Sequence, residues 1–277
     1  MYILGISCYY HDASATLLKD GRIAAAAAEE RFTRQKHDKS YPKNAIRFCL
    51  EKENIEPEYL DHIAFYEKPF LKFERILHQH ISRFPSSYTS FLKTLPSWIT
   101  KKLRIKKTIN NDLQTDHDIA FIKHHECHAA SAYYPSPYDD AAILTVDGVG
   151  EWTTTAYGTG VHGEITMLGE QRFPDSLGLL YSTITSLLGF RVNNSEYKVM
   201  GLAAHGTMNR EDNQYYDKLS QTITQHDDAS FTLDMEYYSF HTLQKMYTSK
   251  LKTIHDDPPQ KKDRPTKHQQ DIAAALQ

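Results

Sequence analysis

Two histidines four residues apart, His124 and His128, have the spacing that lets one metal ion be held from a single helix. Side chains at positions i and i+4 lie on one helical face, about one turn apart, so both imidazoles can reach the same ion. Two ligands are fewer than a bound metal ion needs, so a third has to come from elsewhere in the chain. The alternative is a pair of surface histidines at the start of a helix, spaced in this way by coincidence.

Asp147 is the natural third ligand, because it follows an apolar segment, 141–146, that is typical of a buried strand. Open α/β sheets place their functional residues at the carboxyl ends of strands, which is where Asp147 stands. The sequence therefore predicts a catalytic metal site made of His124, His128 and Asp147.

A glycine-rich turn begins at Asp147 and continues through Gly148 and Gly150 to the next predicted strand. Backbone without side chains can approach phosphate oxygens and offer them N–H groups, so both glycines are candidate cofactor-binding residues. The turn is not a P-loop, since it has no Gly-Lys-Ser/Thr, and not a Rossmann fingerprint, since a strand follows it. An ordinary Asp-Gly hairpin turn is the simpler alternative.

His11 and Asp12 lie in the connection between the first two predicted strands. A histidine beside an aspartate can act as a general base near neutral pH, and the alternative is a polar turn with no chemical task.

A second polar segment combines an acid, Glu196, a cation, Lys198, and a glycine, Gly201, before an apolar step. These residues could hold a nucleotide. The alternative is a capped helix that carries an exposed ion pair.

The elements that must position these residues begin with three short apolar segments, 2–7, 13–18 and 23–29. Their connections are too short for a parallel crossover, so the three strands must form an antiparallel meander. A helix is expected from Pro42 to about residue 50, followed by a strand at 62–66.

A second series of elements has the same character and suggests a duplicated architecture. It comprises a strand at 119–123, a helix from about His125 to Tyr134, strands at 141–146, 151–157 and 164–172, and a helix at 176–188. From Arg210 onward the composition predicts polar, helical structure with a Pro/Lys-rich loop at 258–265.

Residues 67–117 interrupt this order with interleaved aromatic and basic side chains. We interpret them as an amphipathic helical insertion whose lysines form a solvated face, the alternative being a patch for phosphate or an acidic partner. Residues 1–118 then form a first lobe, and residues 119–277 begin a second one. The helical pattern at 269–277 has no capping glycine and no proline after it, so we expect a fragment, truncated within the second lobe.

The overall charge of the chain is nearly balanced. Its 277 residues have a formal net charge of −3, which gives no support for binding nucleic acid or an anionic membrane surface. The apolar start is too short to span a membrane and lacks the basic residues of a signal peptide. Its 3 cysteines are widely separated and form no C-x-x-C pair. We therefore expect a cytoplasmic protein with no membrane or nucleic-acid partner.

Seven strings in this sequence occur in the same order in O-carbamoyltransferases of the nodulation and antibiotic-tailoring type, and the chain resembles that family. The likeness covers most of residues 1–206 and returns at 271–277. The strings are His11-Asp12-Ala13-Ser14, Glu29-Glu30-Arg31-Phe32, Lys36-His37-Asp38, His124 to Ser131, Asp147 to Glu151, Ser176 to Tyr181 and Glu196 to Leu202.

The resemblance implies an α/β, sugar-kinase/heat-shock-protein/actin-like (ribonuclease H-like) fold with two lobes, each built on a five-stranded mixed sheet, the second lobe being incomplete here. It implies that His124, His128 and Asp147 bind a divalent metal ion, iron or zinc, with a further aspartate from the second lobe. The ion would hold the phosphate of carbamoyl-adenylate and stabilise charge as that group leaves.

The resemblance also implies an ATP-binding carbamoyltransferase. Glu196, Lys198 and Gly201 match the segment that lines the adenylate pocket, and His11 and Asp12 lie where the acceptor hydroxyl is activated. The implied partners are carbamoyl-adenylate, a hydroxylated small-molecule acceptor and a separate C-terminal domain that makes carbamoyl-adenylate. A homodimer is also compatible with the resemblance. We expect this chain alone not to complete turnover.

One departure and two alternatives limit this interpretation. The family usually reads Leu-Ala-Pro-Tyr-Gly where this chain has Leu202-Ala203-Ala204-His205-Gly206. The H-x-E-x-H stretch at His124 is also similar to tRNA threonylcarbamoyl transferases, although the net charge does not favour tRNA. The other alternative is a non-catalytic nucleotide-binding or scaffold domain of the same fold.

Overall fold

The computed structural model describes residues 1–85, 87–242, 245–254 and 265–277, so most of the Pro/Lys-rich loop expected at 258–265 lies outside the described residues. The chain divides into two compact units. The first comprises Met1–His78 and Phe91–Ser131, and the second comprises Gln79–Ser90 and Ala132–Gln277.

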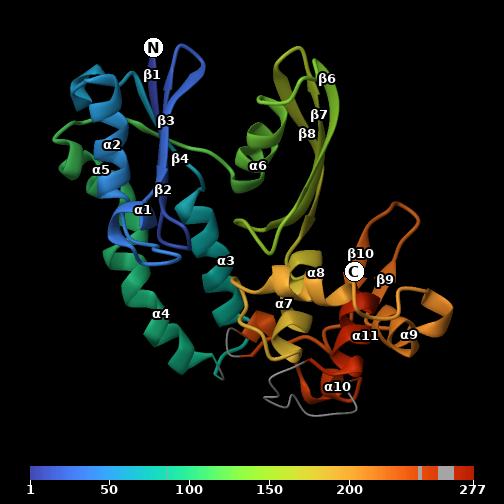
Figure 1. Cartoon of the computed structure of the whole chain (residues 1–277). Coiled ribbons are helices and arrows are strands. Elements are labelled where there is room, and N and C mark those ends of the chain that lie inside the picture. The colour runs from blue at the N-terminus through green and yellow to red at the C-terminus, as the bar shows by residue number, and fades with distance from the viewer. Residues whose placement is uncertain (86, 243–244, 255–264) are drawn as a thin grey trace. The chain divides into compact units, whose positions relative to one another are not determined.

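Five strands form the sheet of the first unit: β1 (Tyr2–Ser7), β2 (Ser14–Lys19), β3 (Arg22–Ala28), β4 (His62–Phe65) and β5 (Ile119–Phe121). Their order is β3-β2-β1-β4-β5 (Figure 1). β1 pairs antiparallel with β2 and parallel with β4. The predicted antiparallel meander is confirmed, and the sheet is the five-stranded mixed sheet that the resemblance implied.

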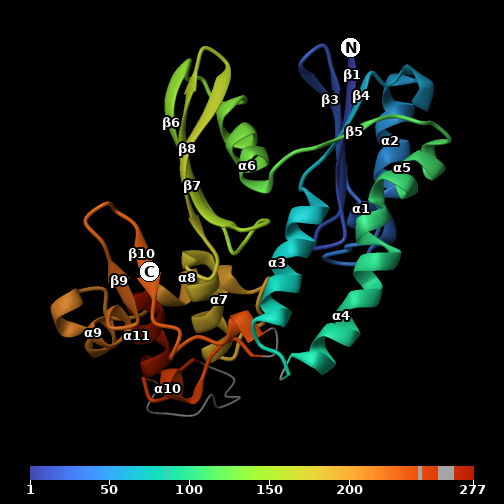
Figure 2. The same cartoon turned by 180° about the vertical axis from the view of Figure 1, so that it is seen from behind.

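The N-terminal part of the chain also forms the helices α1 (Glu30–Thr33), α2 (Lys43–Glu53), η1 (Pro57–Tyr59), α3 (Pro69–Ile81), α4 (Tyr88–Thr100), η2 (Lys102–Arg104), α5 (Ile105–Leu113) and α6 (His124–Tyr133). α2 and α5 lie against one face of the sheet (Figures 1 and 2). Ile46 of α2 and Ile109 of α5 are buried with Leu4 and Ile6 of β1 in one core. The helix predicted from Pro42 is therefore the helix that covers the first sheet.

Residues 67–117 are largely helical, as predicted, and their aromatic residues make the contact between α3 and α4. The rings of Phe73 and Trp98 lie 5.6 Å apart between centroids, and Trp98 is 2% exposed. The ammonium of Lys102 lies 4.5 Å from the centroid of Trp98. This lysine therefore packs on an aromatic ring and does not belong to a fully solvated face.

The second unit contains a three-stranded antiparallel sheet made of β6 (Asp140–Val146), β7 (Thr153–Val161) and β8 (Glu164–Arg172). Its first strand alternates between covered and exposed residues, as expected of a sheet with one covered face. The C-terminal end of α6 packs on that face, because a Cβ added at Gly160 would lie 2.5 Å from the ring of Tyr133.

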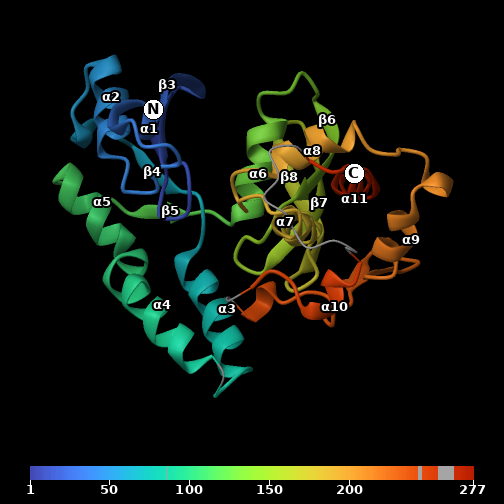
Figure 3. The same cartoon turned by 60° about the horizontal axis from the view of Figure 1, so that its bottom comes forward.

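The remaining helices of the second unit are α7 (Leu177–Leu187), α8 (Glu196–Ala203), η3 (Arg210–Asp212), α9 (Gln214–Ser220), η4 (Phe240–Thr242), α10 (Ser249–Lys252) and α11 (Lys267–Leu276). Ile184, Val199 and Ile272 share one buried core, which joins α7, α8 and α11 (Figure 3). The C-terminal helix predicted from the sequence is confirmed, and a capping box of Thr266 and Gln269 starts it.

A short hairpin was not predicted. β9 (Ile223–Gln225) and β10 (Phe231–Leu233) pair antiparallel where only polar, helical structure was expected. Three-residue strands are too short to show a period-two pattern, so tertiary packing decides their conformation.

The predicted α/β class is confirmed by these sheets and their covering helices. In the part of the chain that the structure describes, no helix has both the length and the apolar character needed to cross a membrane.

Candidate functional site

The two predicted metal-binding histidines lie in the first turns of α6 and face each other. Nε2 of His124 lies 3.0 Å from Nε2 of His128, and the ring centroids are 4.5 Å apart. This is the arrangement expected of residues four positions apart on a helix. Imidazole nitrogens this close either share a proton or direct both lone pairs at one cation.

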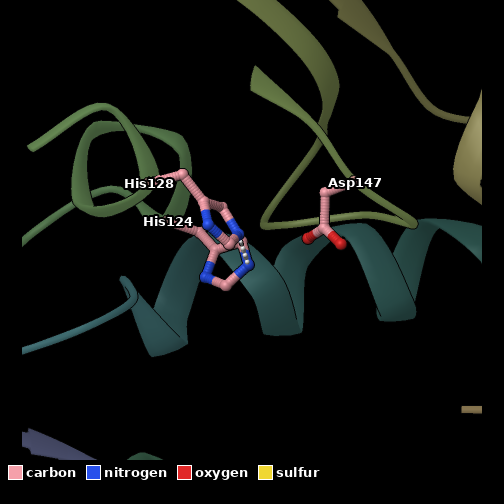
Figure 4. Close-up of side chains that lie close together, drawn as sticks. All are labelled: His124, His128 and Asp147. Carbon is pink, nitrogen blue, oxygen red and sulfur yellow. Dashed lines mark hydrogen bonds between the residues drawn. The ribbon is translucent and has the colours of Figure 1, made fainter. Parts of the chain in front are cut away.

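Asp147 lies near the pair (Figure 4). One ligand atom from each of His124, His128 and Asp147 lies within 4.8 Å of the other two. Two nitrogen ligands of a tetrahedral zinc ion, each about 2.0–2.1 Å from it, lie roughly 3.3 Å apart, which is close to the separation of the two imidazoles. Two imidazoles and a carboxylate suit iron or zinc. The residues present therefore fit a divalent metal ion.

Contacts of two tyrosines, Tyr66 and Tyr133, position α6, the helix that carries both histidines. The ring of Tyr66 meets that of His124 edge-on, with centroids 5.6 Å apart. At the other end of the helix, the hydroxyl of Tyr133 donates to the carbonyl oxygen of Asp139 at 2.6 Å and accepts the N–H of Gly163 at 3.0 Å. These hydrogen bonds tie the helix to the end of the β6–β7 pair at which β6 begins and β7 ends.

Asp147 is held by its own turn and by the start of α7. Its N–H donates to the carbonyl oxygen of Thr154 at 2.9 Å, and its Oδ1 accepts the N–H of Gly148 at 2.7 Å. The hydroxyl of Ser176, which also caps α7, donates to the carbonyl oxygen of Gly148 at 2.7 Å. A Cβ added at Gly178 would lie 2.5 Å from the carbonyl oxygen of Asp147. The backbone of Asp147 is therefore closely confined.

The two glycines predicted to bind phosphate donate their N–H groups inside the turn. Gly148 donates to the side chain of Asp147, and Gly150 donates to the carbonyl oxygen of Thr153 at 2.9 Å. A phosphate bound at this turn would have to compete with one of these two hydrogen bonds.

Glu196, the first residue of α8, holds the segment that precedes its helix. Its carboxylate accepts the N–H groups of Asn193 at 2.8 Å and Asn194 at 3.0 Å, and the hydroxyl of Ser182 at 2.9 Å. Burial acts to raise the pKa of the Glu196 carboxyl, but the hydrogen bonds outweigh burial and hold this pKa below its usual value. Among the described residues, α8 has no side-chain cap and Glu196 forms no ion pair with Lys198, so the alternative of a capped helix with an exposed ion pair is not found.

Lys198 and Gly201 lie on the exposed side of α8. The ammonium of Lys198 lies 5.9 Å from the ring centroid of Tyr197, and it forms no salt bridge with a carboxylate among the described residues. A Cβ added at Gly201 would meet no atom within 4 Å. This face of α8 thus presents an accessible cation beside open space.

His11 and Asp12 form a hydrogen bond in the β1–β2 connection. Nδ1 of His11 lies 2.8 Å from Oδ2 of Asp12, and the two side chains are 50% and 48% exposed. The ring of Tyr10 lies against that of His11, with centroids 4.7 Å apart. The structure brings the predicted base and its carboxylate together and leaves both accessible.

His37, which was not among the site residues predicted from the sequence, contacts the same carboxylate. Its Nδ1 lies 3.0 Å from Oδ1 of Asp12, across 25 positions of sequence. The available signal was the Lys36-His37-Asp38 string, which carries part of the resemblance without assigning a task to the histidine.

Comparison with known proteins gives a family for this chain. A family model described as Carbamoyltransferase N-terminus matches residues 2–277. The uncharacterized protein sll1178 of Synechocystis is 42% identical over 286 residues, which cover 100% of this chain and 46% of that protein. The nodulation protein NolNO of Sinorhizobium fredii is 33% identical over 201 residues, which cover 72% of this chain and 28% of that protein. The chain therefore spans less than half the length of these relatives.

Among solved structures, component A of (R)-2-hydroxyglutaryl-CoA dehydratase from Acidaminococcus fermentans is 15% identical, with a TM-score of 0.42 over 75% of this chain and 60% of that chain. The family assignment rests on the match along the sequence. The chain belongs to the carbamoyltransferase family, whose N-terminal region it matches from residue 2 to residue 277.

Proposed function

We propose that the protein transfers a carbamoyl group from carbamoyl-adenylate to a hydroxyl group of a small-molecule acceptor. Membership of the carbamoyltransferase family supports this proposal. The observation that carries it is the convergence of His124, His128 and Asp147 within 4.8 Å, because a scaffold that had lost catalysis has no need of three such ligands together.

His124, His128 and Asp147 would hold the divalent ion, iron or zinc. When bound, such an ion acts as a Lewis acid and stabilises negative charge on the phosphate of the leaving adenylate. The contribution of the chain is to keep the ligands in place, through the packing of α6 by Tyr66 and Tyr133 and through the confined backbone of Asp147.

His11 is the proposed general base. Its Nδ1–H is directed at Asp12 across 2.8 Å, which leaves the lone pair of the neutral ring on Nε2. As the acceptor oxygen bonds to the carbamoyl carbon, the bond from that carbon to the adenylate oxygen breaks and the adenylate leaves with the electron pair. Nε2 of His11 takes the proton that the acceptor hydroxyl loses.

The adenylate is proposed to contact the β6–β7 turn at Gly148 and Gly150 and the segment of Glu196, Lys198 and Gly201. The accessible ammonium of Lys198 can pair with a phosphate, and Gly201 leaves room for close approach of a nucleotide. Glu196 maintains this segment by accepting the N–H groups of Asn193 and Asn194, which precede α8.

Metal analysis of the purified protein tests the proposed site. The wild type should bind about one ion per chain. His128→Ala should weaken binding by more than the roughly 10–100-fold that follows loss of a residue that only orients a ligand. His62→Ala is the matched control, because His62 is an exposed histidine of β4 and should leave the metal content unchanged. A well-folded wild type that binds neither iron nor zinc would contradict the metal site.

A transfer assay tests the activity. Because this chain is not expected to make carbamoyl-adenylate and so complete turnover alone, the assay supplies carbamoyl-adenylate labelled in its carbamoyl group. The metal-loaded protein should then label a hydroxylated small molecule from a panel. The same labelling by His128→Ala, at an unchanged rate, would show that the three-ligand group does not serve the reaction.

A further inference from the structure

Asp12 accepts hydrogen bonds from two imidazoles at once. Nδ1 of His11 lies 2.8 Å from its Oδ2, and Nδ1 of His37 lies 3.0 Å from its Oδ1. An ionised carboxylate can only accept hydrogen bonds, so each Nδ1 must carry its proton. Both neutral rings are therefore held in the same tautomer, with the lone pair on Nε2.

Both Nε2 atoms are available to a ligand. Within the described part of the chain, neither of them makes a hydrogen bond, and the side chains of His11 and His37 are 50% and 40% exposed. The arrangement is thus not a buried structural network. It is an accessible pair of imidazoles fixed through one carboxylate.

The loop that carries His37 is aligned with the β1–β2 connection on both sides of Asp12. The N–H of Ala13 donates to the carbonyl oxygen of Asp38 at 2.7 Å, and the N–H of Tyr9 donates to the carbonyl oxygen of Lys39 at 2.8 Å. These two bonds bracket the contact between His37 and Asp12, so the approach of the histidine is set by the backbone.

Side chains of the same region fix the loop further. The N–H of His37 donates to the Glu30 carboxylate at 3.0 Å. The carboxylate of Asp38 accepts the hydroxyls of Ser40 at 2.6 Å and Thr33 at 2.7 Å. His37 is therefore anchored through its own backbone and through its neighbour.

The backbone conformation gives an independent sign that the contact is enforced. Tyr9, Asp12 and His37 all have left-handed φ angles, of 70°, 46° and 56°. Bulky residues such as tyrosine rarely adopt this region, and residues that do so cluster at functional sites.

We infer that His37 is a positioning residue: by donating Nδ1–H to Oδ1 of Asp12, it holds the carboxylate so that Oδ2 faces Nδ1 of His11. This inference rests on the proposed use of His11 as the base. The carboxylate oriented in this way keeps Nε2 of His11 unprotonated and ready to take the proton of the acceptor hydroxyl.

Two variants of His37 separate its donor from the rest of its ring. His37→Asn places an amide N–H where Nδ1–H stands and offers nothing at Nε2, whereas His37→Gly removes both. Asparagine and glycine both tolerate the left-handed backbone at this position, so neither substitution adds strain.

The first readout is the tautomer of His11, measured by nitrogen-15 NMR of the ring at pH 8.5, where an unperturbed imidazole is neutral. The wild type and His37→Asn should hold His11 in the Nδ1–H form. His37→Gly should populate both tautomers or exchange between them. An Nδ1–H form kept equally in all three proteins would overturn the inference, and this readout needs no carbamoyl transfer.

The second readout is transfer activity in the labelling assay. His37→Gly should lower kcat about 10-fold, a part of the 10²–10⁴-fold that a general base contributes, with little change in KM, and His37→Asn should restore it. If His37→Asn is as slow as His37→Gly, Nε2 of His37 acts directly and the positioning inference is wrong. Absence of transfer in the wild type would contradict the proposed function and leave the NMR result to decide the geometry.

Discussion

The two sheets begin with the same antiparallel meander but differ at their first strands. β1 has a partner on each edge, β2 antiparallel and β4 parallel, whereas β6 pairs with β7 alone among the described residues. The two strands also offer a contrast in burial, since Leu4 of β1 is fully buried whereas Leu144 lies on the exposed face of β6 and is 70% exposed. A side chain on the covered face of a sheet stabilises the core, whereas one on the exposed face contributes little to it.

Each meander carries a candidate functional residue in the connection after its first strand. His11 and Asp12 follow β1, and Asp147 follows β6. In the β1–β2 connection, Asp12 is contacted by His37 from a separate loop. In the β6–β7 connection, the backbone of Asp147 is contacted by Gly178 in the first turn of α7. The shared topology provides the position, and the neighbouring segment determines which chemistry is available there.

The largest expected effect tests the difference in burial between Leu4 of β1 and Leu144 of β6. Leu4→Ala should lower the free energy of unfolding by about 2–5 kcal/mol, because it removes a fully buried side chain and leaves a cavity. Leu144→Ala should change it by no more than about 0.5 kcal/mol, because that side chain is mostly in water. Urea unfolding of the two variants measures both values, and equal losses would contradict the comparison.

A smaller effect tests the contact between Gly178 and the backbone of Asp147 in the β6–β7 connection. Gly178→Ala should cost about 1–3 kcal/mol of stability, because its Cβ meets the backbone of Asp147, and it should also weaken metal binding. Gly201→Ala is the matched control for folding, since its Cβ meets open space in a helix and should add roughly 0.5–1 kcal/mol. Thermal unfolding with metal titration measures both. Unchanged metal affinity in Gly178→Ala would show that Asp147 does not depend on this contact.

The smallest expected effect is a difference between the two units in how their stability depends on pH. Burial, and after it the charge of Arg83, lowers the pKa of His241 in the second unit to about 4. Between pH 6.5 and 4 the unfolded chain therefore binds a proton that the folded unit does not, and stability falls over that range as pH is lowered. The expected loss is on the order of 1–2 kcal/mol, less than the full shift would give, because His241 is only half-buried and solvent screens its charge.

The first unit should respond at lower pH. Hydrogen bonds from Ser40 and Thr33 hold the pKa of Asp38 below its usual value, so its contribution persists above pH 3.8 and is lost as pH falls through the lowered pKa. Hydrogen exchange, corrected for the intrinsic effect of pH, should show the second unit opening first. His241→Gln should remove the difference, and loss of protection in both units together would contradict it.

The sequence by itself determined the features that depend on local spacing. Residues four apart on a helix must share a face, so the proximity of His124 and His128 followed once the helix was predicted. Short turns between apolar segments required an antiparallel meander, and the C-terminal helix followed from composition. The resemblance, carried by ordered strings of residues, gave the family before any contact was known.

Only the tertiary structure decided which distant segments meet. It brought His37 to Asp12 across 25 residues, packed Gly178 against Asp147, and directed the carboxylate of Glu196 at the hydroxyl of Ser182 in α7. Hydrogen bonds and close packing between segments leave no periodic trace in a sequence, because each depends on how two separately formed elements are placed. Periodicity therefore predicted the elements and the histidine pair, while the partners of Asp12 and Asp147 became visible only in the folded chain.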